Sequence, residues 1–370
     1  MKRFMPLALA VASANLAAQS LPMEHVLISA PLQKQEAETA LPVTVLTGED
    51  LRRSARSTIG DTLGDIPGLA NASFGPGVGQ PVIRGQQGPR VTVLQNGTSS
   101  ADASSVSADH AVSVDSLLAD SIEVLRGPAT LLYGAGAIGG VVNVIDNRIP
   151  RQRIEGVTGG AELRHDSASD MDTAIVRMDA GSGNFAFHID GLYRDWNNLD
   201  IPGLAAREHD EDHEEEHAGE EHEEHEEEAE TTDGYIDNTG GRTRNLTLGS
   251  SYHFDRGLVG LAVSRLENNY GIPAGAHGHH EEGHEGEEHE GEEHGEEEEG
   301  GIRLEVKQTR IDANFELAQP LPGFDSLRAT VTHTDYEHAE IEGNGEVGTL
   351  YSNESWETRA ELVHTEIGGL

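Results

Sequence analysis

Histidine and acidic side chains are concentrated in two tracts, residues 208–230 and 277–299. Together the tracts hold eleven of the nineteen histidines and 27 of the 66 acidic residues, and neither contains a lysine or an arginine. In a chain without cysteine, imidazole nitrogens and carboxylate oxygens form a ligand set suited to borderline divalent metals such as zinc. The tracts therefore predict cation binding, and the plainer alternative is a solvated, disordered loop whose charges repel one another.

The two tracts differ in how their histidines are spaced. Those of the first tract are His209, His213, His217, His222 and His225. Intervals of three or four residues would bring such side chains to one face of a helix. Those of the second tract are His277, His279, His280, His284, His289 and His294. Frequent glycines disfavour a helix there. We expect weak capture of cations at many sites, weakening as pH falls towards about 5, because protons compete with metal for imidazole.

Composition and motifs outside the tracts exclude several functions. Without the 27 acidic residues of the tracts, the formal charge of −41 becomes −14, and no basic stripe is present to bind nucleic acid. The run from Gly134 to Gly139 matches the dinucleotide fingerprint GxGxxG. That motif requires a following helix, whereas residues 141–145 are typical of a strand. No arrangement of nucleophile, base and acid stands out, so we expect neither an enzyme nor an organic cofactor.

The N-terminus has the pattern of an export signal. Lys2 and Arg3 precede a short apolar run, and small residues follow. Residues 1–18 are therefore expected to be a signal peptide, with cleavage after Ala14 or Ala18. The run is too short for a membrane anchor. No later stretch is apolar and long enough for a transmembrane helix. If the chain crosses a membrane, it must do so as a closed barrel.

The remaining sequence divides into a linker and two domains. Residues 23–40 form a short β-prone run with a polar linker. Residues 41–150 indicate a compact mixed α/β domain, with strands near 41–46, 82–85, 91–94, 121–127 and 140–145 and a helix near 47–56. Asn96-Gly97 is a strong turn signal within it. Residues 151–370 change to long segments of alternating polarity.

These alternating segments predict a transmembrane barrel wall. Phe185, Phe187 and Ile189 would share one face of a strand, with His188 and Asp190 on the other. About eight such strands are expected, near 155–165, 171–181, 184–195, 242–254, 257–268, 301–318, 325–338 and 349–367. One apolar and one charged face fit lipid outside and water inside, although a soluble sandwich would alternate as well.

Loop lengths favour the barrel and fix its topology. Short connections at 182–183, 255–256 and 319–324 alternate with longer segments at 200–241, 270–300 and 339–348. Alternate connections of an up-and-down barrel lie at the same end, and outer-membrane barrels keep short turns on the periplasmic side. Both tracts are therefore predicted at one rim, facing away from the cell.

The mixed domain resembles the plug of TonB-dependent outer-membrane receptors. Three segments in order carry the resemblance: residues 41–69, residues 82–97 and residues 122–145, the last containing Ile122-Glu123-Val124-Leu125-Arg126-Gly127-Pro128 and Tyr133-Gly134. The resemblance implies a plug followed by an antiparallel transmembrane β-barrel in the outer membrane of a Gram-negative bacterium, monomeric and surrounded by lipid. Residues 25–30, which begin with His25 and end with Ala30, resemble the box that contacts TonB. Such receptors close with 22 strands, so the chain is interpreted as an N-terminal portion.

Further motifs resemble the zinc-uptake receptors of this family, the ZnuD type. These are Tyr270-Gly271-Ile272-Pro273, Pro320-Leu321-Pro322-Gly323-Phe324, Tyr336-Glu337-His338-Ala339-Glu340 and Asp109-His110. The common rim and the resemblance together predict that Asp109 and His110 face Glu340, with His338 as a further candidate ligand. Zinc is the expected cargo. Two alternatives stay open: a receptor of the same fold for nickel, copper, haem or a metal chelate, and a surface metal-binding protein that transports nothing.

Overall fold

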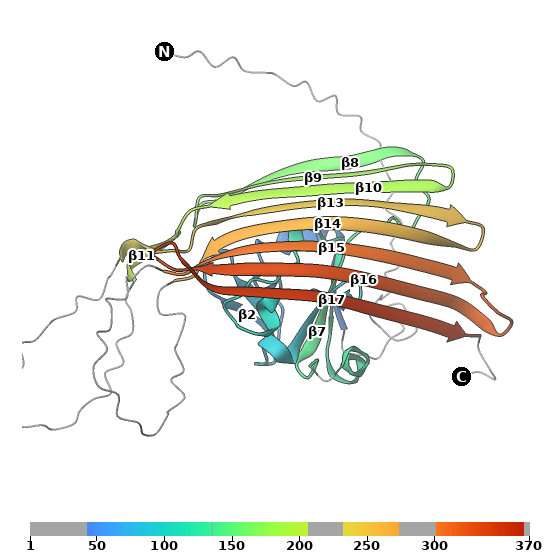
Figure 1. Cartoon of the computed structure of the whole chain (residues 1–370), viewed down its shortest axis with the longest axis horizontal. Coiled ribbons are helices and arrows are strands. Elements are labelled where there is room, and N and C mark those ends of the chain that lie inside the picture. The colour runs from blue at the N-terminus through green and yellow to red at the C-terminus, as the bar shows by residue number, and fades with distance from the viewer. Residues whose placement is uncertain (1–42, 135, 206–231, 274–300, 366–370) are drawn as a thin grey trace, which may run out of the picture.

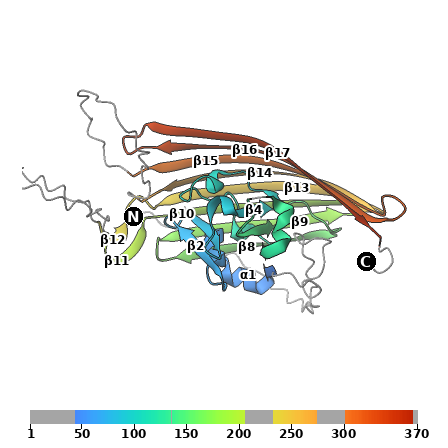
Figure 2. The ribbon, with the colours of Figure 1, turned by 90° about the horizontal axis from the view of Figure 1, so that it is seen from below.

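The computed structural model describes residues 43–134, 136–205, 232–273 and 301–365. They form two bodies: a small mixed domain, which we call the plug, and a curved eight-stranded sheet, which we call the wall. The plug lies against the concave face of the wall (Figures 1 and 2). In the described residues, no helix is long and apolar enough to cross a membrane.

The plug is built on a five-stranded sheet in the order β1-β6-β7-β4-β5. Its strands are β1 (Val43–Thr47), β4 (Val91–Gln95), β5 (Thr98–Ser99), β6 (Ser121–Leu125) and β7 (Gly140–Ile145). The remaining elements are a hairpin of β2 (Leu69–Ser73) and β3 (Gly79–Ile83), the helices α1 (Gly48–Ser54) and α2 (Ile59–Leu63), and the 3₁₀ turns η3 (Gly88–Arg90), η4 (Ala103–Ser105), η5 (Ser116–Leu118) and η6 (Gly127–Tyr133). The segment that follows the glycine fingerprint is strand β7, as the sequence predicted.

Local sequence explains two of these boundaries. Thr58 caps α2 by accepting a hydrogen bond from the backbone N–H of Asp61. Asn96 and Gly97 both have positive φ, 53° and 88°, which suits the tight turn between β4 and β5.

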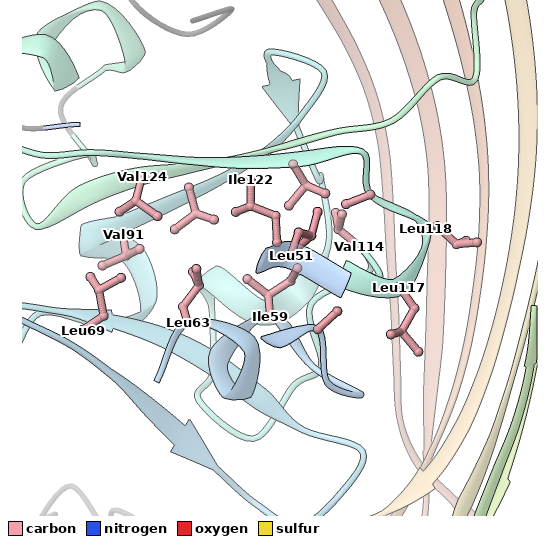
Figure 3. Packing of buried hydrophobic residues seen from close by; sticks show 14 of the residues in the cluster. Leu51, Ile59, Leu63, Leu69, Val91, Val114, Leu117, Leu118, Ile122 and Val124 are labelled. Carbon is pink, nitrogen blue, oxygen red and sulfur yellow. The ribbon is translucent and has the colours of Figure 1, made fainter. Parts of the chain in front are cut away.

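The helices pack on the sheet through buried aliphatic side chains (Figure 3). Burial of Leu51, Ile59 and Ile122, each at most 3% exposed, contributes the hydrophobic stabilisation of this core.

The wall is an antiparallel sheet in the order β17-β16-β15-β14-β13-β10-β9-β8. Its strands are β8 (Gly156–Asp166), β9 (Met171–Ser182), β10 (Phe185–Trp196), β13 (Gly241–Phe254), β14 (Gly257–Gly271), β15 (Arg303–Ala318), β16 (Phe324–Ile341) and β17 (Val347–His364). All eight agree with the predicted strands to within a few residues. Among the described residues β8 and β17 are edge strands, so this part of the wall is open.

The segment 200–241 contains a hairpin that the sequence did not predict. Strands β11 (Leu199–Ala205) and β12 (Thr232–Ile236) pair with each other at the end of the wall where β10 stops (Figure 1). Pro202 and Gly203 interrupt the alternation of polarity in β11, and Gly234 does so in β12. The sequence pattern therefore did not indicate either strand. Their register shifts between Asp200 and Leu204, as expected for so irregular a pair.

The two faces of the wall have the predicted polarity. Phe185, Phe187 and Trp356 on the convex face are more than half exposed. His188, Asp190 and Arg194, on the opposite face of β10, are buried. This separation fits lipid outside and a polar, plugged interior.

Strand direction places the longer connections at one rim, which we call the outer rim. Trp196, Gly241, Tyr270 and Leu304 follow one another in register across the sheet, and Leu304 pairs with Glu340. The segments 197–240, 272–302 and 342–346 therefore leave from the same end, and the turns at 183–184, 255–256 and 319–323 lie at the other. The tracts themselves lie outside the described residues.

A charged network joins the plug to the wall. Arg148, just after β7, donates to Asp146 and to Asp312 on β15, with the shortest distance to each 2.8 Å. Arg310, 1% exposed, donates to the backbone oxygens of Ser99 and Gln95 and to Asp312. Burial alone would raise the pKa of Asp146, but Arg148 lowers it to about 2.

The segment after Arg148 lies directly on the wall, in a niche formed where two glycines lack side chains. A Cβ on Gly249 would collide with the carbonyl of Arg148, and one on Gly260 with the side chain of Ile149. The hydroxyl of Ser251 donates to the carbonyl of Pro150 at 2.7 Å. Missing side chains therefore allow the backbone of the linker to lie directly on the sheet.

Candidate metal centre

Strand β16 presents three potential site residues to the plug. Tyr336, His338 and Glu340 are two residues apart, and alternate residues of a strand point to the same face. Tyr336 and His338 are 0% and 2% exposed, whereas Glu340 lies nearer the outer rim and is partly exposed. The strand thus aligns a hydroxyl, an imidazole and a carboxylate in order towards the rim.

The opposite side of the site is a plug loop between η4 and η5. Gln80 holds this loop through its Nε2, which donates to the carbonyls of Ser107 and His110 at 2.9 Å each. The backbone N–H of Ala111 donates to the hydroxyl of Tyr270 on β14 at 2.9 Å. One plug side chain and one wall side chain therefore fix the backbone on either side of His110.

Three potential ligand atoms converge where the loop meets β16. Nε2 of His110 lies 3.2 Å from Nε2 of His338 and 3.5 Å from Oε1 of Glu340. Nε2 of His338 lies 3.8 Å from the same Oε1 of Glu340. Two ligands bound to zinc at 2.0–2.1 Å in a tetrahedral arrangement lie roughly 3.3 Å apart. The spacing of these atoms therefore suits a single small cation.

Asp109 occupies a different position from the three converging residues. Its Oδ1 lies 2.8 Å from Nδ1 of His110 and accepts a hydrogen bond from Ser107. A carboxylate at the far nitrogen of an imidazole fixes the ring and its tautomer and makes the near nitrogen a better ligand. In this arrangement Asp109 is placed to orient His110, and its predicted position facing Glu340 stays a prediction.

The donor set has definite chemical consequences. Two imidazoles and one carboxylate form a three-residue set of the kind that binds zinc with a fourth position open to water or another ligand. Carboxylate and imidazole donors without sulfur also accept nickel and copper(II). Among the described residues, His110, His338 and Glu340 are the one group of three or more such side chains with converging ligand atoms.

The remaining predicted site residues cannot be placed. The histidines of both tracts and residues 25–30 lie outside the described residues. The structure adds three tyrosines that sequence reasoning had given no role: Tyr270, Tyr336 and Tyr351. Tyr351 on β17 stacks on the His338 ring at 5.2 Å and 19°. The spacing of Tyr336, His338 and Glu340 was a usable signal for Tyr336.

Comparison with known proteins identifies the class of fold. Residues 35–141 match the family model "TonB-dependent Receptor Plug Domain". The chain is similar in structure to the alcaligin outer-membrane receptor FauA from Bordetella pertussis, with a TM-score of 0.59, 13% identity and coverage of 93% of this chain and 47% of that one. It is also similar to the copper transporter OprC, with a TM-score of 0.57, 15% identity and coverage of 80% and 38%.

The FrpB iron transporter from Neisseria meningitidis is a third similar structure, with a TM-score of 0.58, 11% identity and coverage of 88% of this chain and 47% of that one. The chain thus spans less than half the length of these three proteins. Its fold is a TonB-dependent receptor plug followed by part of an antiparallel outer-membrane barrel, which confirms the predicted fold class. It also confirms the predicted location, the outer membrane of a Gram-negative bacterium.

Proposed function

We propose that the chain belongs to a TonB-dependent receptor that takes up a divalent metal ion, with zinc as the main cargo. The observation that carries this proposal is the convergence of His110 from the plug with His338 and Glu340 from the wall. A site shared by two bodies holds a cation only while the plug is docked. Movement of the plug would separate the ligands and release the ion.

In this proposal the tracts and the site have successive roles. The segments that contain the tracts leave the wall at the outer rim, towards which β16 presents Glu340, and in this proposal the tracts offer many weak ligands to cations in the medium. The site offers fewer ligands. Asp109 holds the ring of His110, and the Gln80 side chain donates to the backbone carbonyl of His110. Ions captured loosely at the rim would then transfer to a tighter position.

Uptake against a gradient needs energy, and TonB is the proposed source. Residues 25–30 would add as a strand to this periplasmic partner, and its pull would rearrange the plug. Deleting residues 24–30 should abolish zinc uptake and leave zinc binding intact. Uptake that persists in the deletion variant would refute the energised mechanism. A surface protein that only binds metal would need neither residues 25–30 nor the plug.

Zinc binding to the detergent-solubilised full-length receptor tests the site directly. Titration against a competing chelator should show one tight site in the native protein. That site should be lost in His110→Ala and in His338→Ala. His333→Ala is the matched control, because His333 lies on β16 with its ring stacked on Trp356 of the convex face. Unchanged tight binding in both site variants would reject the site.

Other cargoes are the second candidate function. One similar structure is a copper transporter, and imidazole ligands bind copper(II) at least as tightly as zinc. The close spacing of the three ligand atoms favours a bare ion over a chelate. Growth of a strain that depends on this receptor, with zinc, nickel or copper as the single limiting ion, separates the cargoes.

A further inference from the structure

Tyr336 lies directly behind His338, on the side away from the proposed cation. Its hydroxyl oxygen is 3.1 Å from Nδ1 of His338, and its ring meets the imidazole edge-on at 5.6 Å. Both side chains are buried. The hydroxyl also lies near the backbone of Ala103 in the plug. Tyr336 is thus a wall residue whose hydroxyl meets a ligand of the proposed cation at the boundary with the plug.

The partners of the two imidazoles determine where their protons lie when the rings are neutral. The carboxylate of Asp109 can only accept, so Nδ1 of His110 carries a proton and its Nε2 is bare. Nε2 of His338 is 3.2 Å away and must therefore donate to it. Nδ1 of His338 is then bare and accepts a hydrogen bond from the Tyr336 hydroxyl.

A cation between the rings requires the opposite arrangement at His338. Both Nε2 atoms must offer lone pairs, so the His338 proton has to leave Nε2, and a proton from water has to bind Nδ1. The number of protons on the ring stays the same. Nδ1–H then donates to the Tyr336 oxygen. A hydroxyl can donate in one state and accept in the other, whereas a carboxylate or a backbone N–H could serve only one of them.

We propose that Tyr336 is a positioning residue that keeps a hydrogen bond at Nδ1 of His338 while this ring exchanges a proton at Nε2 for a metal ion. The proposal rests on the proposed function, because it assigns a role at the same site. Partners of this kind typically contribute 10–100-fold to metal affinity. The hydroxyl contributes because an imidazole nitrogen without a partner in this buried position is costly.

The test compares two variants that each lose one hydroxyl. Tyr336→Phe in the full-length receptor should weaken Zn²⁺ binding about 10–100-fold and alter the visible absorption of the Co²⁺-loaded protein. Tyr252→Phe is the matched control, because Tyr252 packs on Phe185 at the convex face of the wall, and it should leave both unchanged. In a His338→Ala background, Tyr336→Phe should have no further effect on Zn²⁺ affinity.

A second measurement uses the native side chains. Addition of Zn²⁺ should shift the tyrosine C–O band in the infrared difference spectrum, because the hydroxyl changes from donor to acceptor, and Tyr252→Phe should keep this shift. Native Zn²⁺ affinity in Tyr336→Phe, or no shift of the band, overturns the role of Tyr336 alone. Loss of the proposed function would instead appear as unchanged Zn²⁺ affinity in His110→Ala.

Discussion

The Nε2 atoms of His110 and His338 lie 3.2 Å apart although 228 residues separate them along the chain. One belongs to the plug and the other to the wall, so a cation bound to both joins two bodies that pack through a polar seam. Any ligand that binds only the docked arrangement also stabilises it, and the coupling is reciprocal. The following predictions use this relationship and the seam around it.

Zinc should stabilise the docked plug. With free zinc at 100 times its dissociation constant, binding adds about 2.7 kcal/mol to the docked state. Limited proteolysis of the plug should therefore become slower when zinc is added. His110→Ala should be cut at the same rate with and without zinc. Equal zinc protection of the native protein and His110→Ala would show that zinc acts elsewhere.

Asp109→Asn should weaken zinc binding without removing a ligand. An amide at this position can no longer act as a charged acceptor for Nδ1 of His110, so the ring loses its fixed tautomer, at a cost of about 10–100-fold in affinity. Chelator competition provides the measurement. Asp65→Asn, on an exposed side chain of the plug, is the control and should retain native affinity.

The seam should lose stability in acid at a defined pH. The pKa of Asp146 is lowered from 3.8 to about 2 in the folded protein, so its carboxylate, paired with Arg148, stabilises the folded plug fully above about pH 4. That contribution is lost as pH falls through about 2, and it amounts to roughly 2–3 kcal/mol. Chemical denaturation of the plug, followed from pH 6 to pH 2, should show this loss. Asp146→Asn should lack it.

Arg310→Lys should loosen the plug even though the charge is kept. The guanidinium donates to Ser99 and Gln95 in the plug and to Asp312 in the wall, and one ammonium cannot reach all three. We expect faster proteolysis of the plug around β5. Arg265→Lys on the opposite, exposed face of the wall is the control. Native proteolysis rates in Arg310→Lys would show that the seam holds without these bonds.

Removing both tracts should separate capture from binding. A receptor without residues 208–230 and 277–299 should take up zinc more slowly when zinc is scarce and at the native rate when it is abundant. The affinity of the site between plug and wall should not change. Radioactive zinc uptake at two concentrations makes the comparison. If the receptor without the tracts takes up zinc at the native rate at both concentrations, the tracts have no role in capture.

Much of the fold followed from sequence because it depends on local patterns. A period of two over ten or more residues predicted all eight wall strands, and the alternation of short and long loops predicted their rims. Strands β11 and β12 escaped because Pro202, Gly203 and Gly234 break the period. Their pairing brings together segments on either side of the first tract, which no local pattern records.

The candidate site was predictable only in part. Asp109-His110 and Glu340 stood out by motif, but which atoms face the cation depends on how the plug docks. Asp109 contacts Nδ1 of His110, a contact that the motif did not indicate. The role of Tyr270 depends on the backbone of Ala111, which is more than 150 residues away in sequence. The role of Tyr336 depends on the tautomer of the neighbouring His338 ring. Spacing along the chain contains neither kind of information.

The glycine niche at Gly249 and Gly260 has a mechanical consequence. The linker from Arg148 to Pro150 is held by backbone contact with the sheet, by Ser251 and by Asp312, so β7 and the wall form one anchored unit. A load applied at the N-terminal end of the plug would reach β1 first, which within the described part of the chain is an edge strand paired with β6. The sheet would then be peeled from its free border towards the anchor, and the plug would remain tethered to the wall throughout.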